Sequence, residues 1–184
     1  MENMVNIFLM GKKYEVPSSL TIMKAMEYAG LTGKEVVLDA YCGTGTIGMI
    51  ASDHAKEVIG VELNKDAVKD AVSNAKYNEI SNIRFYQNDA GKFLVDMAEK
   101  GLKLDVLLMD PPRSGSDEAF LSSVVKLHPK RVVYISCGPD TLVRDLKHLT
   151  KNGYKVQRTV ALDMFPFTDH VESVTLLEYV GRKG

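Results

Sequence analysis

The sequence predicts an α/β fold built on a doubly wound, mostly parallel sheet of seven strands, one of them antiparallel. The first observation behind this prediction is that short apolar runs alternate with helical segments from about Lys34 onward. Strands that are buried between layers of helices have this pattern. The second is that the last two strand-like runs have no helix between them, so they would pair as a hairpin. The third is the length of 184 residues, which fits one domain with its own core.

Seven apolar runs supply the expected strands, and the segments between them supply the helices. The strands are expected at residues 35–40, 57–63, 83–87, 104–110, 131–136, 155–162 and 173–180. The helices are expected at residues 46–54, 65–78, 90–100, 117–127 and 140–152. Asn64 has the side chain and position of a helix N-cap, and Gly101 and Gly153 have the positions of helix stops. One apolar stripe in the second helix consists of Ala67, Val68, Ala71, Val72 and Ala75.

The first 30 residues form an N-terminal extension in this prediction, and residues 31–184 form the main domain. Residues 5–16 alternate in the manner of a small hairpin. One of the two serines that follow would cap a helix running through Ala29. No residue of the extension carries identifiable chemistry, so we expect it to extend the sheet at its edge or to cover a ligand site.

The composition is that of an ordinary globular protein. The hydrophobic fraction of 45%, the charged fraction of 26% and the net charge of -1 disfavour disorder, collagen-like repeats and coiled coils. No apolar run approaches the roughly 20 residues of a membrane helix, and the N-terminus lacks the features of a secretory signal. Cys42 and Cys137 form neither a disulfide framework nor a metal-type pair, so no metal and a reducing, cytoplasmic location are expected. The near-neutral charge argues against strong electrostatic attraction to nucleic acid.

A glycine-rich turn, DAYCGTGTIG, follows the first strand at residues 39–48. Gly43 and Gly45 lack a Cβ, so a ligand can approach the backbone closely before the chain enters a helix. Glu62 ends the second strand, where an acid in nucleotide-type sites accepts hydrogen bonds from ribose hydroxyls. Asp39 suits a cationic ligand, such as a sulfonium with an amino-acid tail, better than a pyrophosphate.

A third acid, Asp89, follows the third strand and would meet an adenine amino group there. The alternative is a tight strand-to-helix turn with incidental surface acids. Because the glycines and the acids stand together at the ends of successive strands, we favour a nucleotide-type cofactor site.

Two further motifs follow later strands and would share the same edge of the sheet. The segment DPPR at residues 110–113 follows the fourth strand, and its two prolines make it rigid. Cys137 follows the fifth strand just before a helix, where the positive end of the helix dipole favours the thiolate. Cys137 is therefore the candidate nucleophile, and the alternative is a small buried apolar residue. Cys42 lies inside the glycine turn and is interpreted as structural.

The segment FPFTDHVE at residues 165–172 joins the last two strands and would also lie near this edge. A single histidine such as His170 is more often a surface or packing residue than a catalyst. Glu172, next to the apolar Val171, is the better candidate for a base, since partial burial raises a carboxyl pKa toward neutrality.

Four motifs occur in order along the chain: LDAYCGTGTIG, DPPRSG, YISCGPDTLVRDL and DMFPFTDHVESV. Together they resemble the RNA (uracil-5-)methyltransferase family, over a stretch from about Tyr28 to the C-terminus. The resemblance implies a Rossmann-like class I methyltransferase fold for residues 31–184, with S-adenosyl-L-methionine as the cofactor. It also implies transfer of a methyl group to C5 of a uridine in tRNA or rRNA through a covalent cysteine adduct, which yields 5-methyluridine.

The resemblance implies a role for each matched residue. Cys137 matches the nucleophile of the family, and Glu172 matches the residue that removes the C5 proton. Tyr41, Glu62 and Asp110 match cofactor-contacting positions, and Thr46 matches a position lining the same site, to which Asp39, Gly43, Gly45 and Asp89 are added from the residues themselves. The expected substrate-side residues are Asp110, Arg113, Phe165 and Phe167, with a phenylalanine stacking on a uridine flipped out of its stack.

Two departures from the family pattern concern RNA binding and one cofactor contact. The family usually carries an N-terminal oligonucleotide-binding barrel and a central RNA-contacting region, and both are absent from these 184 residues. The letters VPSSLTIMK stand where the family has a Gln-rich, cofactor-contacting stretch, and the segment at the start of the chain resembles the beginning of a β-grasp fold. We therefore expect RNA to bind weakly.

Two alternatives remain open. One is an S-adenosylmethionine-binding module or reduced domain without independent RNA turnover, which would share every motif. The other is a methyltransferase that acts on another substrate, such as an exocyclic amine. Enzymes of that kind tend to place an aromatic residue after the two prolines, and this chain has Arg113 there.

Overall fold

The computed structural model describes residues 4–9, 12–17, 21–163 and 171–181, and all structural statements refer to these. The strands are β1 (Met4–Leu9), β2 (Lys12–Pro17), β3 (Val36–Ala40), β4 (Glu57–Glu62), β5 (Ile83–Gln87), β6 (Val106–Met109), β7 (Arg131–Ser136), β8 (Tyr154–Leu162) and β9 (Glu172–Tyr179). The helices are α1 (Thr21–Ala29), α2 (Thr46–Ser52), α3 (Lys65–Tyr77), α4 (Ala90–Glu99), α5 (Glu118–Leu127) and α6 (Pro139–Lys151). The expected elements are all present, with ends that differ by a residue or two.

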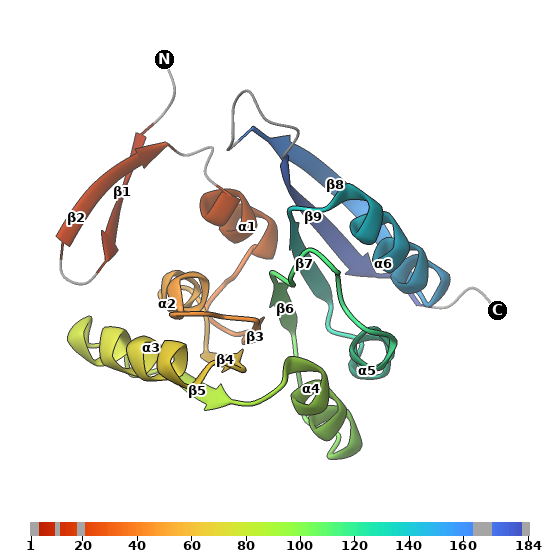
Figure 1. Ribbon diagram of the computed structural model, residues 1–184, viewed down its shortest axis with the longest axis horizontal. Coiled ribbons are helices and arrows are strands. Elements are labelled where there is room, and N and C mark those ends of the chain that lie inside the picture. The colour runs from red at the N-terminus through yellow and green to blue at the C-terminus, as the bar shows by residue number, and fades with distance from the viewer. Residues whose placement is uncertain (1–3, 10–11, 18–20, 164–170, 182–184) are drawn as a thin grey trace.

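The main sheet has seven strands in the order β5-β4-β3-β6-β7-β9-β8 (Figure 1). The pairs from β5 to β7 are parallel, whereas β9 is antiparallel to both β7 and β8. This arrangement confirms the predicted sheet, including its single antiparallel strand. The hairpin of β8 and β9 inserts β9 between β7 and β8, so β9 begins at the edge where the parallel strands end.

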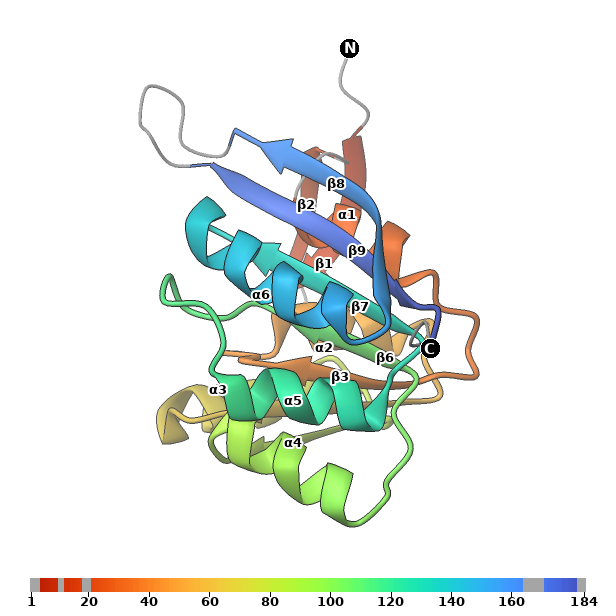
Figure 2. The ribbon, with the colours of Figure 1, turned by 90° about the vertical axis from the view of Figure 1, so that its right-hand side faces the viewer.

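Helices cover both faces of the sheet, with α1, α2 and α3 on one face and α4, α5 and α6 on the other (Figures 1 and 2). Successive strand residues alternate between the two layers. Leu107 packs in the core beneath α4, α5 and α6, and its neighbours Val106 and Leu108 pack in the core beneath α1, α2 and α3. This period of two, with apolar residues on both faces, is why the strands read as continuous apolar runs.

Local signals in the sequence explain where the helices begin. The Asn64 side chain accepts hydrogen bonds from the backbone N–H groups of Asp66 and Ala67, so it caps α3 as predicted. The Asp117 side chain caps α5 by accepting from the N–H of Phe120. Pro139 stands at the start of α6, where its missing N–H costs nothing.

The N-terminal hairpin of β1 and β2 is confirmed (Figure 1). It forms a two-stranded sheet of its own, so the expectation that it extends the main sheet at its edge is wrong. The helix after it, α1, packs against β7 and β9, and its residues Ala25 and Ala29 are fully buried. The serines expected to cap this helix lie outside the described residues. Within the described part of the chain, none of the helices has the length and apolar character needed to cross a bilayer.

Candidate active site

Loops from several strands meet at the edge of the sheet where the parallel strands end, which we call the rim. The rim comprises residues 41–48 after β3, 62–64 at the end of β4, 88–89 after β5, 110–117 after β6, 137–138 after β7 and 171–172 at the start of β9. Figure 2 shows the segment between β6 and α5 and the first turn of α6 on this same side of the sheet. All candidate site residues within the described part of the chain lie on the rim or directly beneath it.

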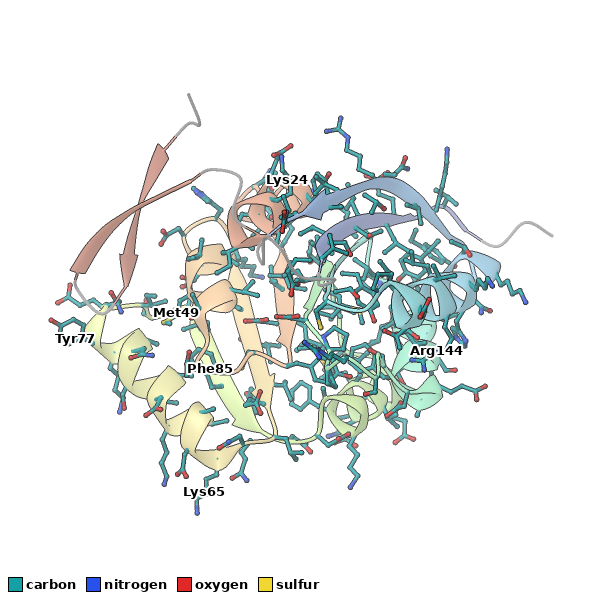
Figure 3. The ribbon with its side chains drawn as sticks, turned by 45° about the horizontal axis from the view of Figure 1, so that its top comes forward. Lys24, Met49, Lys65, Tyr77, Phe85 and Arg144 are labelled. Carbon is teal, nitrogen blue, oxygen red and sulfur yellow. The ribbon has the colours of Figure 1, made fainter. Side chains whose placement is uncertain are left out.

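The glycine-rich turn takes a left-handed backbone conformation at three positions. Its φ angles are positive at Tyr41 (64°), Gly43 (54°) and Gly45 (84°). A Cβ at Gly45 would lie 2.6 Å from the ring of Phe85, which β5 directs under the turn (Figure 3). A Cβ at Gly43 would meet nothing within 4 Å, so the space above this residue is open to a ligand.

Glu62 is fixed against this turn. Its Oε2 accepts a hydrogen bond of 3.0 Å from the N–H of Gly43, and its Oε1 accepts one of 2.7 Å from the N–H of Asn64. Each carboxylate oxygen keeps a further lone pair for a ligand. The next residue, Leu63, is 65% exposed and presents apolar surface beside the carboxylate. Leu63 was not among the predicted site residues, although an apolar residue directly after the strand-end acid was a readable signal.

Asp39 lies beneath the turn and not above it. Its side chain is 1% exposed, and its Oδ2 accepts a 2.8 Å hydrogen bond from the N–H of Gly48. A Cβ at Gly48 would lie 2.8 Å from this oxygen, so glycine is needed there. The expectation that Asp39 faces a cationic ligand is therefore corrected, because burial and this hydrogen bond assign the carboxyl to holding the turn.

Burial raises the pKa of Asp39 to about 7, even though the Gly48 N–H favours the carboxylate, and the negative charges of Asp110 and Glu62 raise it further. The folded pKa lies above the ordinary value of 3.8, so between these pH values the folded chain holds a proton that the unfolded chain releases. The stability from this proton is complete below about pH 4 and is lost as the pH rises toward 7.

Asp39→Asn is expected to flatten this pH dependence. The amide oxygen of asparagine can still accept from Gly48, but it carries no charge at any pH. The free energy of unfolding of the parent chain, relative to the variant, should fall by on the order of 4 kcal/mol between pH 4 and pH 7.5. Urea unfolding followed by circular dichroism at several pH values measures it. Asp53→Asn, at an exposed position at the end of α2, is the control and should leave the slope unchanged; equal slopes in all three proteins would contradict the assignment.

The other expected cofactor residues occupy defined places on the rim. Tyr41 is partly buried and packs its ring on Phe120 of α5, with ring centroids 5.4 Å apart. Burial raises the pKa of its phenol, and the charges of Asp117 and Asp89 add to this. Asp89 caps α4, since its Oδ1 accepts a 2.9 Å hydrogen bond from the N–H of Lys92. Thr46 is the first residue of α2, directly after the glycine turn.

Cys137 and Glu172 stand at the same end of the β7–β9 ladder. Ser136 pairs with Ser173 in that ladder, and the Ser173 hydroxyl donates a 3.3 Å hydrogen bond to the Ser136 carbonyl. This pair is the last of the ladder: Cys137 follows Ser136 at the end of β7, and Glu172 precedes Ser173 at the start of β9, so both residues stand at the same end of the two strands. Cys137 is a free, partly exposed thiol between the end of β7 and the start of α6.

Asp110 joins this pair from the neighbouring strand. Loss of hydration, where the surrounding protein covers its carboxyl group, raises the pKa of Asp110 to about 6, and the negative charge of Glu172 raises it further. The backbone N–H of Asp110 donates to the carbonyl of Ala40 at the end of β3, which ties the DPPR segment to the glycine turn. The structure thus gathers a thiol and two carboxyl groups at the middle of the rim.

Cys42 differs from Cys137 in its surroundings. Its side chain is 8% exposed, and its Sγ would be 3.1 Å from a Cβ at Gly60 of β4. Burial raises the pKa of the Cys42 thiol well above its usual range, and the charges of Asp39 and Glu62 reinforce this. This thiol packs under the turn, so of the two cysteines only Cys137 stands at the surface of the rim.

The substrate-side predictions are placed only in part. Arg113 is exposed in the segment between β6 and α5. Phe165 and Phe167, like His170, lie outside the described residues. In the described part of the chain no group of three or more His, Cys, Asp and Glu side chains is arranged to hold a metal ion.

A buried acid behind the rim was missed by sequence reasoning. Asp145 of α6 is fully buried, and its carboxylate accepts hydrogen bonds from the N–H of Ser116 and the hydroxyl of Tyr134, both 2.8 Å long. Its neighbour Arg144 donates from Nε to the same carboxylate. An acid within a helix ordinarily reads as a surface residue, so only its contacts reveal its place.

This fold and rim define the class of Rossmann-like methyltransferases. An rRNA methylase from Streptococcus thermophilus superposes with a TM-score of 0.70 over 90% of this chain and 99% of that chain, at 11% identity. At such low identity this likeness concerns the fold alone.

The family model described as tRNA (Uracil-5-)-methyltransferase matches residues 16–180, and the chain belongs to this family. A solved structure of the tRNA (uracil-54, C5)-methyltransferase from Pyrococcus abyssi, in complex with S-adenosyl-L-homocysteine, superposes on this chain with a TM-score of 0.72 at 28% identity. The superposition covers 95% of this chain and 44% of the Pyrococcus chain. Two proteins named as uncharacterized RNA methyltransferases, from Caldanaerobacter subterraneus and Enterococcus faecalis, are each 47% identical to this chain, over 84% and 89% of its length. The chain spans only about a third of their length, 34% and 36%. The predicted family and fold are confirmed.

Proposed function

We propose that this chain is the catalytic domain of an enzyme that transfers a methyl group from S-adenosyl-L-methionine to C5 of a uridine in tRNA or rRNA, through a covalent adduct with Cys137. One observation carries the proposal: in a chain of the uracil-5 family, the partly exposed Cys137 thiol and Glu172 stand at the same end of the β7–β9 ladder, and Asp110 is close enough to Glu172 for its charge to raise the Asp110 pKa.

The residues present fit the proposed cofactor. The space over Gly43 is open, and the Glu62 carboxylate is held at the end of β4 with lone pairs to spare for ribose hydroxyls. Leu63 would cover one face of the adenine, and Asp89 would meet its amino group. When bound, S-adenosyl-L-methionine supplies an electrophilic methyl group. The glycine turn, with Tyr41 and Thr46 on its flanks, would hold this cofactor near the middle of the rim.

The chemistry of uracil explains why both a thiol and a base are needed. C5 of uracil is a weak nucleophile. When the Cys137 thiolate adds to C6, the electron pair of the C5–C6 double bond moves into the C4 carbonyl, and the resulting enolate makes C5 reactive. Once C5 carries the new methyl group, Glu172 removes the remaining C5 proton. The electron pair of that C–H bond restores the C5–C6 double bond, and the thiolate leaves C6.

The position of Cys137 suits this role. It stands directly before the N-terminus of α6, whose dipole and unpaired N–H groups stabilise a nearby anion. The target base has to leave its stack to reach this thiol, at a cost of a few kcal/mol. Arg113 and the aromatic residues Phe165 and Phe167 are proposed to hold the extruded nucleotide.

RNA affinity is proposed to be weak in this chain alone. The net charge is -1, whereas tight RNA binding usually needs a basic surface. The chain spans about a third of the length of its curated relatives, so this proposal concerns these 184 residues alone. The proposed chain organisation is an N-terminal extension, residues 1–30, followed by a methyltransferase domain, residues 31–184.

The proposal is tested by incubating the chain with S-adenosyl-L-methionine and unmodified tRNA and rRNA transcripts, followed by mass spectrometry of the nucleosides. We expect 5-methyluridine in at least one transcript. Formation of another methylated nucleoside would overturn the assignment of C5 of uridine. Binding of S-adenosyl-L-methionine without any product would favour the alternative of a cofactor-binding module, which the limited coverage of the relatives keeps open.

A further inference from the structure

The first two turns of α6 are bonded to the segment that carries the DPPR motif. We call the three residues involved, Thr141, Arg144 and Asp145, the α6 clamp. Arg144 lies on the side of α6 that faces α5 (Figure 3), and one guanidinium nitrogen donates to the carbonyls of Ser114 (3.0 Å) and Ser116 (2.9 Å). Three residues of one helix thus hold a loop that precedes it in sequence by about 30 positions.

Asp145 holds the same loop from the inside. Its Oδ2 accepts from the N–H of Ser116 and from the hydroxyl of Tyr134 in β7, while Oδ1 pairs with Arg144 at 2.7 Å. A fully buried carboxylate is stable only with such a set of donors. The loop, the strand that leads to Cys137 and the helix that follows it therefore share one hydrogen-bond network.

The contact between this loop and the cysteine turn is close. The Thr141 hydroxyl lies 3.0 Å from both the carbonyl of Arg113 and the carbonyl of Gly138, the residue after Cys137. A Cβ at Gly138 would lie 3.3 Å from the Arg113 carbonyl oxygen. The backbone at the end of the DPPR segment thus lies against the backbone of the turn that follows Cys137.

A glycine in the loop permits this approach. Gly115 has a φ of +73°, and a Cβ there would lie 2.5 Å from the Arg144 guanidinium and 2.8 Å from the Asp145 carboxylate. Its N–H donates to the Pro112 carbonyl, which closes a turn directly after the two prolines. The loop therefore has the conformation that the clamp requires.

We propose that the α6 clamp is a positioning device that sets the distance between the Asp110–Arg113 segment and the Cys137 turn. Arg144 and Asp145 act through the loop and need not touch the substrate. The inference rests on the proposed function, since its purpose is to hold the two walls between which the uracil ring would enter. Loss of the clamp lowers the rate of the covalent step much more than it weakens binding of S-adenosyl-L-methionine, because of the proposed cofactor contacts only Asp110 lies on the clamped segment, whereas the glycine turn and Glu62 lie on other strands.

The test uses Arg144→Met, which removes the guanidinium donors, and Thr141→Val, which removes only a hydroxyl and leaves the buried carboxylate paired. Lys147→Met is the matched control, because Lys147 is an exposed cation on the same helix that makes no hydrogen bond or ion pair with the loop among the described residues. Urea unfolding confirms that each variant is folded at the assay temperature.

Two readouts do not depend on activity: backbone hydrogen exchange of residues 112–117 by mass spectrometry, and the rate at which iodoacetamide alkylates Cys137. We expect both to rise by about tenfold in the two clamp variants and to stay unchanged in the control. A third readout is kcat for 5-methyluridine formation, expected to fall by about 10- to 100-fold while the Kd for S-adenosyl-L-methionine changes much less.

The outcomes separate the two proposals. Unchanged exchange and unchanged alkylation in both clamp variants would overturn the clamp, whatever the activity of the parent chain. If Lys147→Met raises exchange and alkylation and lowers kcat as much as the clamp variants do, the clamp is also overturned, because the effect would then follow from the removal of a positive charge. If the parent chain makes no 5-methyluridine but both activity-independent readouts respond, the proposed function fails and the clamp stands.

Discussion

Cys137→Ala is expected to reduce methyl transfer to RNA below detection. Without the thiolate no enolate forms, and C5 of uracil stays too weak a nucleophile to react. The affinity for S-adenosyl-L-methionine should be unchanged, because the glycine turn and Glu62 lie on β3 and β4, away from the cysteine turn. The measurement pairs a methylation assay with isothermal titration of the cofactor. Turnover retained by this variant would remove the covalent mechanism.

A 5-fluorouridine-containing RNA sharpens this test. Fluorine cannot leave as a cation, so the methylated adduct with the parent chain should persist and appear as a slower band on a denaturing gel. Cys42→Ala is the matched control. The Cys42 thiol is buried under the glycine turn and does not take part, so this variant should form the adduct as the parent chain does. Mass spectrometry of the digested adduct should place the nucleotide on the peptide that contains Cys137. An adduct on the Cys42 peptide would contradict the assignment.

Glu172→Gln is expected to stall the reaction one step later. Glutamine has nearly the same shape but cannot accept the C5 proton, so the covalent adduct should accumulate on ordinary uridine, with the methyl group already on C5. Turnover should fall by about 10²- to 10⁴-fold, as is typical when a general base is lost. The adduct is measured on denaturing gels with RNA that contains no fluorine.

The control for this variant is Glu178→Gln at the far end of the same strand, where the side chain accepts a 2.7 Å hydrogen bond from Gln157. It should turn over normally and accumulate no adduct. If Glu172→Gln turns over at the parent rate, the C5 proton leaves to another base. Asp110 is the alternative that the geometry offers, since its carboxyl lies near Glu172 and its pKa is raised to about 6.

Much of the site was predictable because its residues stand at the ends of parallel strands. All parallel strands of one sheet end at the same edge, so the positions of Glu62, Asp110 and Cys137 after three apolar runs predicted that they share this edge. Glu172 follows the same logic, because the second strand of a terminal hairpin starts where the first one ends.

The orientation of individual side chains was not predictable in this way. Asp39 stands in the turn motif and was expected to face a ligand, yet it points beneath the turn toward the N–H of Gly48. Sequence position specifies which strand end a residue occupies but not which side of the loop its side chain takes. That choice is settled in the folded turn, whose φ angles are positive at Tyr41, Gly43 and Gly45 and whose Gly48 N–H donates to the carboxyl group.

The sequence by itself determined the succession of strands and helices along the chain, the edge of the sheet that the strand ends share and the residue types at that edge. Apolar periodicity and capping residues are local signals, which is why they can be recognised without a structure. Only the tertiary structure decided the burial of Asp39, the influence of Glu172 on Asp110 and the bonds from Arg144 and Asp145 to the loop after β6. These interactions join residues that are far apart along the chain, and the energy of a buried charge depends on every group packed around it. No local pattern records such surroundings, so they become visible only once the chain is folded.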